Sequence, residues 1–356
     1  MSVVAGLLGR LEADTAALRL RMEVLTRQVS TGRRAEAQGD IAPALPRALS
    51  LRAEIGRRET YGTAIGEALN RTQATQTVLE RLGAIAREFG DGVAMKLDPG
   101  DTSTLSLVAT RARAALVEVG QLLNSQSAGE YLFGGSDFSR PPVPDPEGLP
   151  TGGLAAGIAA AIAGLGGGNA AAVAAATRAA AMDDGAGVTP FSAFLSDPAS
   201  GLAEPRRSVP AGDGQAVPYG LFANRNAAAA SMGETTGSWA RDLLRGLASL
   251  AALTPAQAAS PADFRALAGT IRDGLKSASN AIADEAGALG LTEARLSAVR
   301  ERHAVLTDAL KAQLADIEEV DLAATLTRLQ ATRTALEASY SALGRLGTLT
   351  LTRYLP

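Results

Sequence analysis

The chain has 356 residues, a net charge of −3, one histidine and no cysteine. The lack of cysteine excludes disulfides, thiolate zinc sites, iron–sulfur clusters and thiol nucleophiles, and one histidine allows at most a single imidazole base. With 4% aromatic residues and no basic excess, the chain has few rings for a ligand pocket and no nucleic-acid footprint.

The N-terminal stretch carries a heptad pattern. Its members recur at alternating steps of three and four: Leu8, Leu11, Thr15, Leu18, Met22, Leu25 and Val29. This spacing places one narrow apolar seam on a helix that packs against a partner helix. Ser30-Thr31-Gly32 ends the predicted helix, because glycine adopts the left-handed conformation of a helix C-terminus. No cleaved signal peptide is recognisable before the seam.

Two further helices are predicted before residue 138. One runs from Leu51 to about Phe89, with several polar groups on its seam, and the other runs from Leu105 to Leu122. A proline-bearing link over residues 33–46 precedes the first, and the turn residues Asp98-Pro99-Gly100-Asp101 separate the two.

Residues 139–235 differ in composition and predict a smaller mixed α/β insert. Alanine and glycine supply 22 of the 31 residues from Thr151 to Ala181, which predicts short, weak helices. Residues 207–219 predict a hairpin around Gly212–Gly214, and Pro210 and Pro218 confine its strands to sheet edges.

Helical patterning returns near Trp239 and runs almost to the end of the chain. Ser260-Pro261 is a helix start, because serine caps and proline suits the first helical position. Helical stripes follow to about Leu346, and even 50 such residues would span ~75 Å. The predicted fold is therefore mainly α: a long antiparallel bundle or coiled-coil stem built from both termini, with the insert projecting from it.

Motifs that could carry chemistry have plainer explanations. His303 lies at a seam position without a second histidine, so we expect a packed imidazole. Gly269–Ser277 resembles a phosphate loop but has the wrong spacing and lies in a helical stripe. The uncharged stretch 148–177 is mostly alanine and glycine with a glycine triplet, so no membrane insertion is expected. The sequence predicts no catalytic, cofactor or metal site, and hence no enzyme.

Several segments together resemble the bacterial flagellin family. Gln28–Arg34 follows the N-terminal helix as in flagellins and flagellin-like hook-associated proteins, and Ala315–Ala323 resembles the acidic break before their last helix. Gly129–Ser136, Leu336–Tyr340 and the ending Leu349–Leu355 resemble the hook–filament junction subfamily more than filament flagellins. The resemblance covers about residues 1–138 and 236–356. Gly39–Pro43 departs from the doubled acidic run that is usual there.

The resemblance implies a structural, self-assembling and extracellular part of the bacterial flagellum, at the junction of hook and filament. Such proteins are exported through the flagellar secretion apparatus without a cleaved signal. The implied partners are other copies in a ring, neighbouring hook-associated and flagellin subunits, and an export chaperone. No nucleic acid or cofactor is implied.

The sequence predicts a three-part organisation and an assembly seam. Residues 1–138 and 236–356 form the N- and C-terminal helical stem, and residues 139–235 form the insert. The predicted assembly seam consists of Leu11, Leu18, Leu25, Val29, Leu322, Leu329, Leu336 and Leu343. Two other functions stay open: a filament flagellin, and a helical adaptor or translocator of a secretion or phage-tail system.

Overall fold

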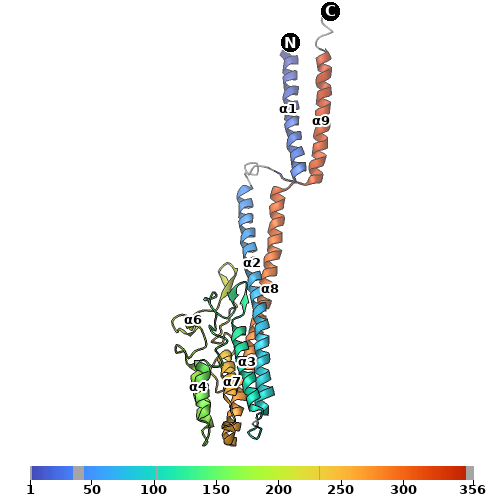
Figure 1. Ribbon diagram of the computed structural model, residues 1–356. Helices are drawn as coiled ribbons and strands as arrows, with labels where there is room; N and C mark the ends of the chain where they lie inside the picture. Colours follow the sequence, from blue (N-terminus) through green and yellow to red (C-terminus); the bar gives the residue numbers. More distant parts are fainter. Residues whose placement is uncertain (1, 35–43, 102, 232, 350–356) are drawn as a thin grey trace, which may run out of the picture. The chain divides into compact units, whose positions relative to one another are not determined.

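The computed structural model describes residues 2–34, 44–101, 103–231 and 233–349. The protein is mainly α-helical: 68% of the described residues lie in helices, and the strands among them form two small antiparallel sheets (Figure 1). This confirms the predicted fold class. The chain forms two compact units, residues 1–60 with 303–356, and residues 61–302.

The two units divide the chain at other places than the sequence suggests. The first unit joins the two ends of the chain, and the second contains everything between them. The change from one unit to the other falls inside two long helices, next to Thr60 and His303, and not at residues 138 and 235. The division into 1–138, 139–235 and 236–356 stays a prediction about sequence organisation.

The first unit is built from paired helices. Its elements are α1 (Ser2–Thr31), the start of α2 (Leu45–Arg87), the end of α8 (Pro261–Glu318) and α9 (Leu322–Leu349). Helices α1 and α9, from opposite ends of the chain, pack side by side (Figure 1). The predicted pairing of the two termini is thus confirmed. The link over residues 35–43 and the ending 350–356 lie outside the described residues.

The second unit contains the remaining helices. The stem elements are the rest of α2 and α8, the π-helix η2 (Glu88–Val93), the 3₁₀ turn η3 (Ala94–Lys96), α3 (Leu105–Leu123), α7 (Trp239–Ala252) and the 3₁₀ turn η4 (Gln257–Ala259). The insert adds α4 (Gly153–Ala163), α5 (Ala170–Met182), α6 (Ala193–Ser196) and the hairpin of β3 (Ser208–Gly212) and β4 (Gln215–Pro218). A shorter hairpin, β1 (Gln126–Ser127) with β2 (Glu130–Tyr131), follows α3. These bounds confirm the predicted short helices and the hairpin of the insert.

The β3–β4 hairpin is fixed along helix α2. Val209 pairs with Val217, and both side chains are buried in a cluster with Ile65 of α2 and Leu296 of α8. Near the hairpin turn, the Tyr61 hydroxyl donates a hydrogen bond of 2.8 Å to Asp213. The hairpin therefore gains its stability from packing against the stem, since an isolated two-stranded sheet is marginal in water.

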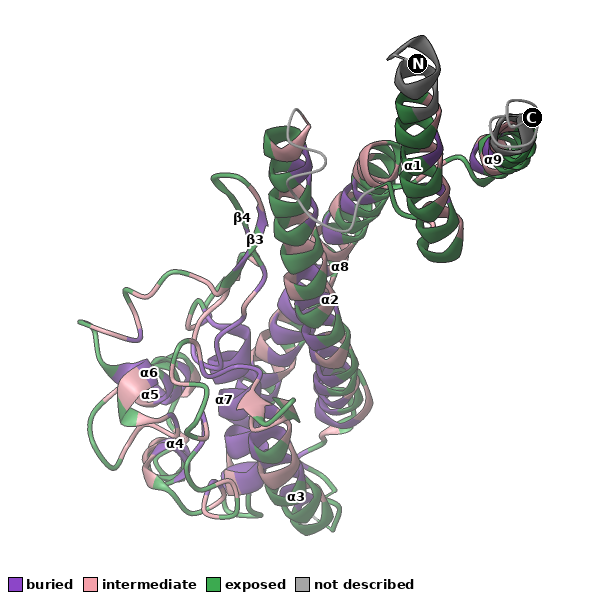
Figure 2. Cartoon of the chain, turned by 90° about the horizontal axis from the view of Figure 1, so that it is seen from above, coloured by how far each residue is buried: buried purple, intermediate pink, exposed green. Residues whose placement is uncertain are grey.

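Helix α7 is the centre of the second unit. Every residue from Trp239 to Ala251 is buried, as the colouring in Figure 2 shows. The Trp239 ring meets Phe133 edge-on, with 6.2 Å between ring centroids. Ile158 and Ile162 of the insert belong to the same apolar cluster as α7. Among the described residues the insert therefore has no separate core but shares apolar clusters with the stem.

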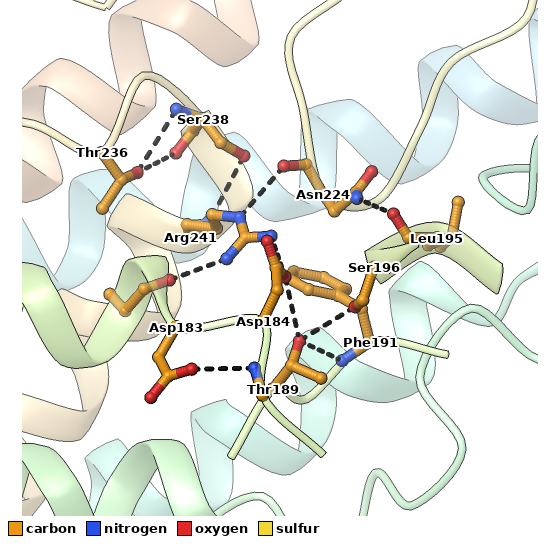
Figure 3. A network of polar contacts seen from close by, with 12 residues as sticks. Asp183, Asp184, Thr189, Phe191, Leu195, Ser196, Asn224, Thr236, Ser238 and Arg241 are labelled. Carbon is orange, nitrogen blue, oxygen red and sulfur yellow. Dashed lines mark hydrogen bonds and ion pairs between the residues drawn. The ribbon is translucent and has the colours of Figure 1, made fainter. Parts of the chain in front are cut away.

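Two buried arginines of α7 attach the alanine-rich helix α5, and the network around one of them, Arg241, is drawn in Figure 3. Arg241 donates to the carbonyl of Ala181 at 3.0 Å and to the carboxylate of Asp184 at 2.6 Å. One turn later, Arg245 donates to the carbonyl of Ala174 at 2.8 Å. Alanine offers little apolar area, so these charge-assisted bonds to backbone oxygens compensate for a weak apolar contact.

Helices α7 and α8 approach closely at a glycine. A Cβ atom added at Gly246 of α7 would lie 2.5 Å from Leu275 Cδ2 of α8, whereas one added at Gly269 of α8 meets nothing within 4 Å. Only hydrogen fits at the first position because the Leu275 side chain is fully buried there.

We therefore expect opposite effects from two glycine-to-alanine substitutions. Gly246→Ala should lower the free energy of unfolding by about 1–3 kcal/mol through overpacking. Gly269→Ala should raise it by about 0.5–1 kcal/mol because alanine is the better helix former. Urea unfolding followed by circular dichroism measures both. Equal effects of the two substitutions would contradict the close approach of α7 and α8.

A buried carboxylate on α7 should make stability depend on pH. Burial raises the pKa of Asp242 above its ordinary value of 3.8, against the opposing effect of hydrogen bonds from Thr236. The folded protein then binds a proton more readily than the unfolded chain, so this stabilising contribution is present below pH 3.8 and is lost as the pH rises through the folded-state pKa. Compared with the isosteric, non-titrating variant Asp242→Asn, the wild type should lose free energy of unfolding as the pH rises from 3.8 to the folded-state pKa of Asp242. Above that pKa, the difference between the two proteins should stay constant. Unfolding free energies measured from pH 3.5 upward check this, and a difference that stays constant throughout that range would contradict it.

Candidate assembly interface

The seam of α1 lies where the heptad pattern places it. Thr15 and Leu25 are buried, and Leu11, Leu18 and Val29 are half-buried. The residues between them are exposed, apart from Met22 and Gln28, which are half-buried on the same side. Because α1 packs against α9, these residues form one side of a two-helix contact, here called the intrachain seam.

The opposite side of the intrachain seam is more polar than the leucine pattern predicts. The buried and half-buried positions of α9 follow a heptad: Thr325, Leu329, Thr332, Leu336, Ser339 and Leu343. Sequence reasoning missed the threonines and the serine of α9 because it followed the leucines of that helix. The seven-residue steps from Thr325 to Thr332 to Ser339 were the signal that could have identified them.

The seam threonines satisfy their hydroxyl groups within their own helices. Thr15 donates to the Leu11 carbonyl at 2.6 Å, and Thr325 donates to the Asp321 carbonyl at 2.7 Å. Such bonds make a buried threonine tolerable but add little attraction across the contact. Among the large apolar residues of the α1–α9 pair, Leu25 and Leu336 are buried, and six others are half-buried: Leu11, Leu18, Met22, Val29, Leu329 and Leu343.

The eight residues of the predicted assembly seam fall into three groups. Leu25 and Leu336 are buried in the intrachain seam. Leu11, Leu18, Val29, Leu329 and Leu343 are half-buried. Leu322 remains 48% exposed in the single chain. Their contact with other subunits stays a prediction.

The ends of the paired helices are joined through their backbones. Arg33 and Glu319 form an antiparallel bridge, with Arg34 N–H donating to the Glu318 carbonyl at 2.7 Å and Val320 N–H to the Gly32 carbonyl at 3.0 Å. Gly32 has a φ of +70°, as its helix-ending position requires. The Asp321 carboxylate accepts a hydrogen bond of 3.0 Å from Ala324 N–H and so caps α9.

A second apolar stripe on α1 faces solvent. It consists of Ala13, Ala17, Leu20 and Val24, at steps of four, three and four, and is here called the outer stripe. Leu20 is 64% exposed, and on α9 Leu322 and Leu326 are about half exposed. Next to the outer stripe, the Arg19 guanidinium lies 5.1 Å from the centroid of the Tyr340 ring, an exposed contact between the two helices. Exposed apolar rows of this kind mark surfaces where other helices bind.

The other candidates from the sequence have structural roles. His303 is buried in the contact of α2 with α8, and its Nδ1 lies 3.4 Å from an Arg58 nitrogen. Because a guanidinium can only donate, this bond requires an unprotonated Nδ1. Gly269–Ser277 lies inside the regular helix α8 and forms no phosphate loop. Among the described residues no acidic or histidine cluster could hold a metal ion.

The described helices were compared with the requirements for crossing a membrane. Within the described part of the chain, no helix combines the length and the apolar character that crossing a bilayer requires.

The end of the chain matches a known family. Residues 273–355 match the model of the bacterial flagellin C-terminal helical region, which takes in most of α8, the capped break at Asp321, and α9. This match supports membership of the bacterial flagellin family. The flagellin family is structural and non-enzymatic. The family assembles into extracellular flagellar polymers after export by the flagellar system. No curated protein matches the chain.

The intrachain seam and the outer stripe should respond differently to truncation. Leu25→Ala removes a side chain that is only 7% exposed and should weaken the α1–α9 pairing by about 2–3 kcal/mol. Leu20→Ala, on the same helix, should change it by less than about 0.5 kcal/mol because that side chain is exposed. Hydrogen exchange of the α1 amides in the unassembled protein measures both, and equal protection in the two variants would count against the assigned seam.

Proposed function

We propose that the protein is a structural component of the bacterial flagellum of the hook-associated protein 3 type, forming the junction between hook and filament. The observation that carries a flagellar role is the pairing of α1 with α9 in a chain whose end matches the flagellin C-terminal helical region. The two helices pack on each other through a half-polar seam and leave apolar rows exposed. A helix pair of this kind is completed by neighbouring subunits.

Burial of the outer stripe supplies the driving force for assembly. Each square ångström of apolar surface that Leu20, Val24 or Leu326 removes from water contributes ~25 cal/mol. Because the outer stripe follows heptad steps, the matching partner is another long helix with the same periodicity. Copies of this chain, neighbouring hook-associated proteins and flagellin subunits are the proposed partners.

The junction role, as distinct from the filament role, is supported by the segment Gly129–Ser136, which resembles the junction subfamily. Its Glu130 carboxylate accepts from Arg71 of α2 at 3.1 Å and from Arg207, next to β3, at 2.6 Å. A single carboxylate thus ties the stem to the insert hairpin. Removing it would leave two guanidinium groups without their shared counter-charge.

Two of the three glycines of this segment, Gly134 and Gly135, have a steric reason. Gly135 has a φ of +65°, and a Cβ atom there would lie 2.9 Å from the Phe222 ring. Gly134 forms a bridge with Phe222, and the adjoining Phe133 is fully buried. Gly129–Ser136 therefore packs in the core of the second unit and holds the insert in a fixed position there. A fixed insert suits a subunit at the joint between hook and filament.

The location of the protein on intact flagella tests this proposal. Immunogold labelling should place the protein only where hook meets filament, and a strain lacking the gene should keep its hooks and release flagellin into the medium. Label along the whole filament, with no flagellin released by the mutant, would establish the filament alternative instead. Label absent from purified hook–basal bodies and filaments would favour an adaptor or translocator of another secretion or phage-tail system.

The outer stripe gives a sharper prediction. Leu20→Asp should abolish swimming while leaving the helix content and melting temperature of the unassembled protein unchanged, because the side chain is exposed in the single chain. Leu20→Met, which keeps the apolar surface, should swim normally. Complementation of the deletion strain in soft agar measures both variants. Normal swimming by Leu20→Asp would show that the outer stripe is not part of the assembly surface.

A further inference from the structure

Asp242 is a charged residue within the fully buried helix α7, and its side chain is only half satisfied. The residue is 2% exposed. Its Oδ1 accepts a hydrogen bond of 2.8 Å from Thr236 N–H. Its Oδ2 is buried and has no hydrogen-bond partner among the described residues. A buried carboxylate oxygen without a partner is costly, so a donor is required at this position.

A small cavity lies beside this carboxylate. It has room of about 10 Å³ for the centre of a water-sized sphere, which corresponds to one water molecule. Three helices provide its walls: α5 contributes Thr177, α7 contributes Asp242, Arg245, Gly246 and Ser249, and α8 contributes Leu267, Thr270, Ile271 and Gly274. Four of these residues besides Asp242 carry polar side chains, whereas a dry cavity would be lined by apolar groups.

The charges around the cavity decide what kind of molecule fits it. The guanidinium of Arg245 lies near Asp242 and is committed to the Thr177 hydroxyl at 3.1 Å and to the Glu234 carbonyl at 3.0 Å. Asp242 and Arg245 are the charged residues of the lining, and Glu234 and Arg178 add one nearby charge of each sign, so the charges at the cavity balance. A cation would add an uncompensated charge, whereas a neutral donor supplies what Oδ2 lacks.

We propose that this cavity binds one internal water molecule, which donates a hydrogen bond to Asp242 Oδ2 and joins helix α7 to helix α8. The hydroxyl groups of Ser249 on α7 and Thr270 on α8 provide its further partners, since a buried water molecule makes about three hydrogen bonds. The water lies beside Gly246 and joins the two helices next to the contact of Gly246 with Leu275. This site is independent of the flagellar role.

The full-length, unassembled protein can be tested by oxygen-17 magnetic relaxation dispersion, which counts water molecules with long residence times. Asp242→Leu, which offers no acceptor, should show one long-lived water molecule fewer than the wild type. Thr270→Val should shorten the residence time of that molecule. Thr292→Val is the matched control, because both threonines are half-buried on α8 and bond the carbonyl four residues earlier, but Thr292 does not line the cavity.

Other outcomes would overturn the proposal. An equal count of long-lived water molecules in the wild type and in folded Asp242→Leu would exclude water at this site. A signal that disappears when choline replaces sodium in the buffer would identify a bound cation instead. If Asp242→Leu does not fold, electron density of the wild-type protein within hydrogen-bond distance of Asp242 Oδ2 decides the question, and the absence of a peak there rejects the site.

Discussion

The structure depends on the need of helix α1 to bury an apolar seam that it cannot bury alone. Its partner is α9, from the other end of the chain, so the seam is covered only when the two ends of the polypeptide have come together. Contacts between such distant segments cost chain entropy, and the α9 side of the seam, half of which is threonine and serine, returns little apolar area. The pair is therefore weakly held inside one chain, and packing against other subunits would add most to its stability.

The second unit has the opposite character. Its central helix α7 is buried on all sides, and stem and insert share one core around Trp239. Polar contacts add to this core: Arg241 and Arg245 hold backbone oxygens of the insert, and Glu130 ties two arginines together. One unit is thus firmly packed in the single chain, while the other presents apolar rows to solvent. This contrast suits a subunit that keeps its shape while its terminal helices assemble.

The proposed water at Asp242 belongs to the firmly packed unit and illustrates its close packing. At Gly246 the helices α7 and α8 are too near for a methyl group, and beside it the remaining space holds about one water molecule. A carboxylate in such a place is tolerated only if both of its oxygens accept hydrogen bonds. The same contact therefore combines steric exclusion with hydrogen bonding.

Heptad spacing, helix caps and turn residues determined the helices of α1, α2, α3 and α8, the β3–β4 hairpin, and the seam of α1, because these depend on neighbours along the chain. Only the tertiary structure decided which face of α9 meets α1. Leucine spacing predicted Leu329, Leu336 and Leu343 on this face but also Leu322, which stays 48% exposed. The packed face also includes Thr325 and Thr332, since a hydroxyl bonded to its own helix can be buried where a pattern of apolar residues does not predict it. The tertiary structure likewise merged the insert with the stem core, because contacts between distant segments leave no periodic signal in the sequence.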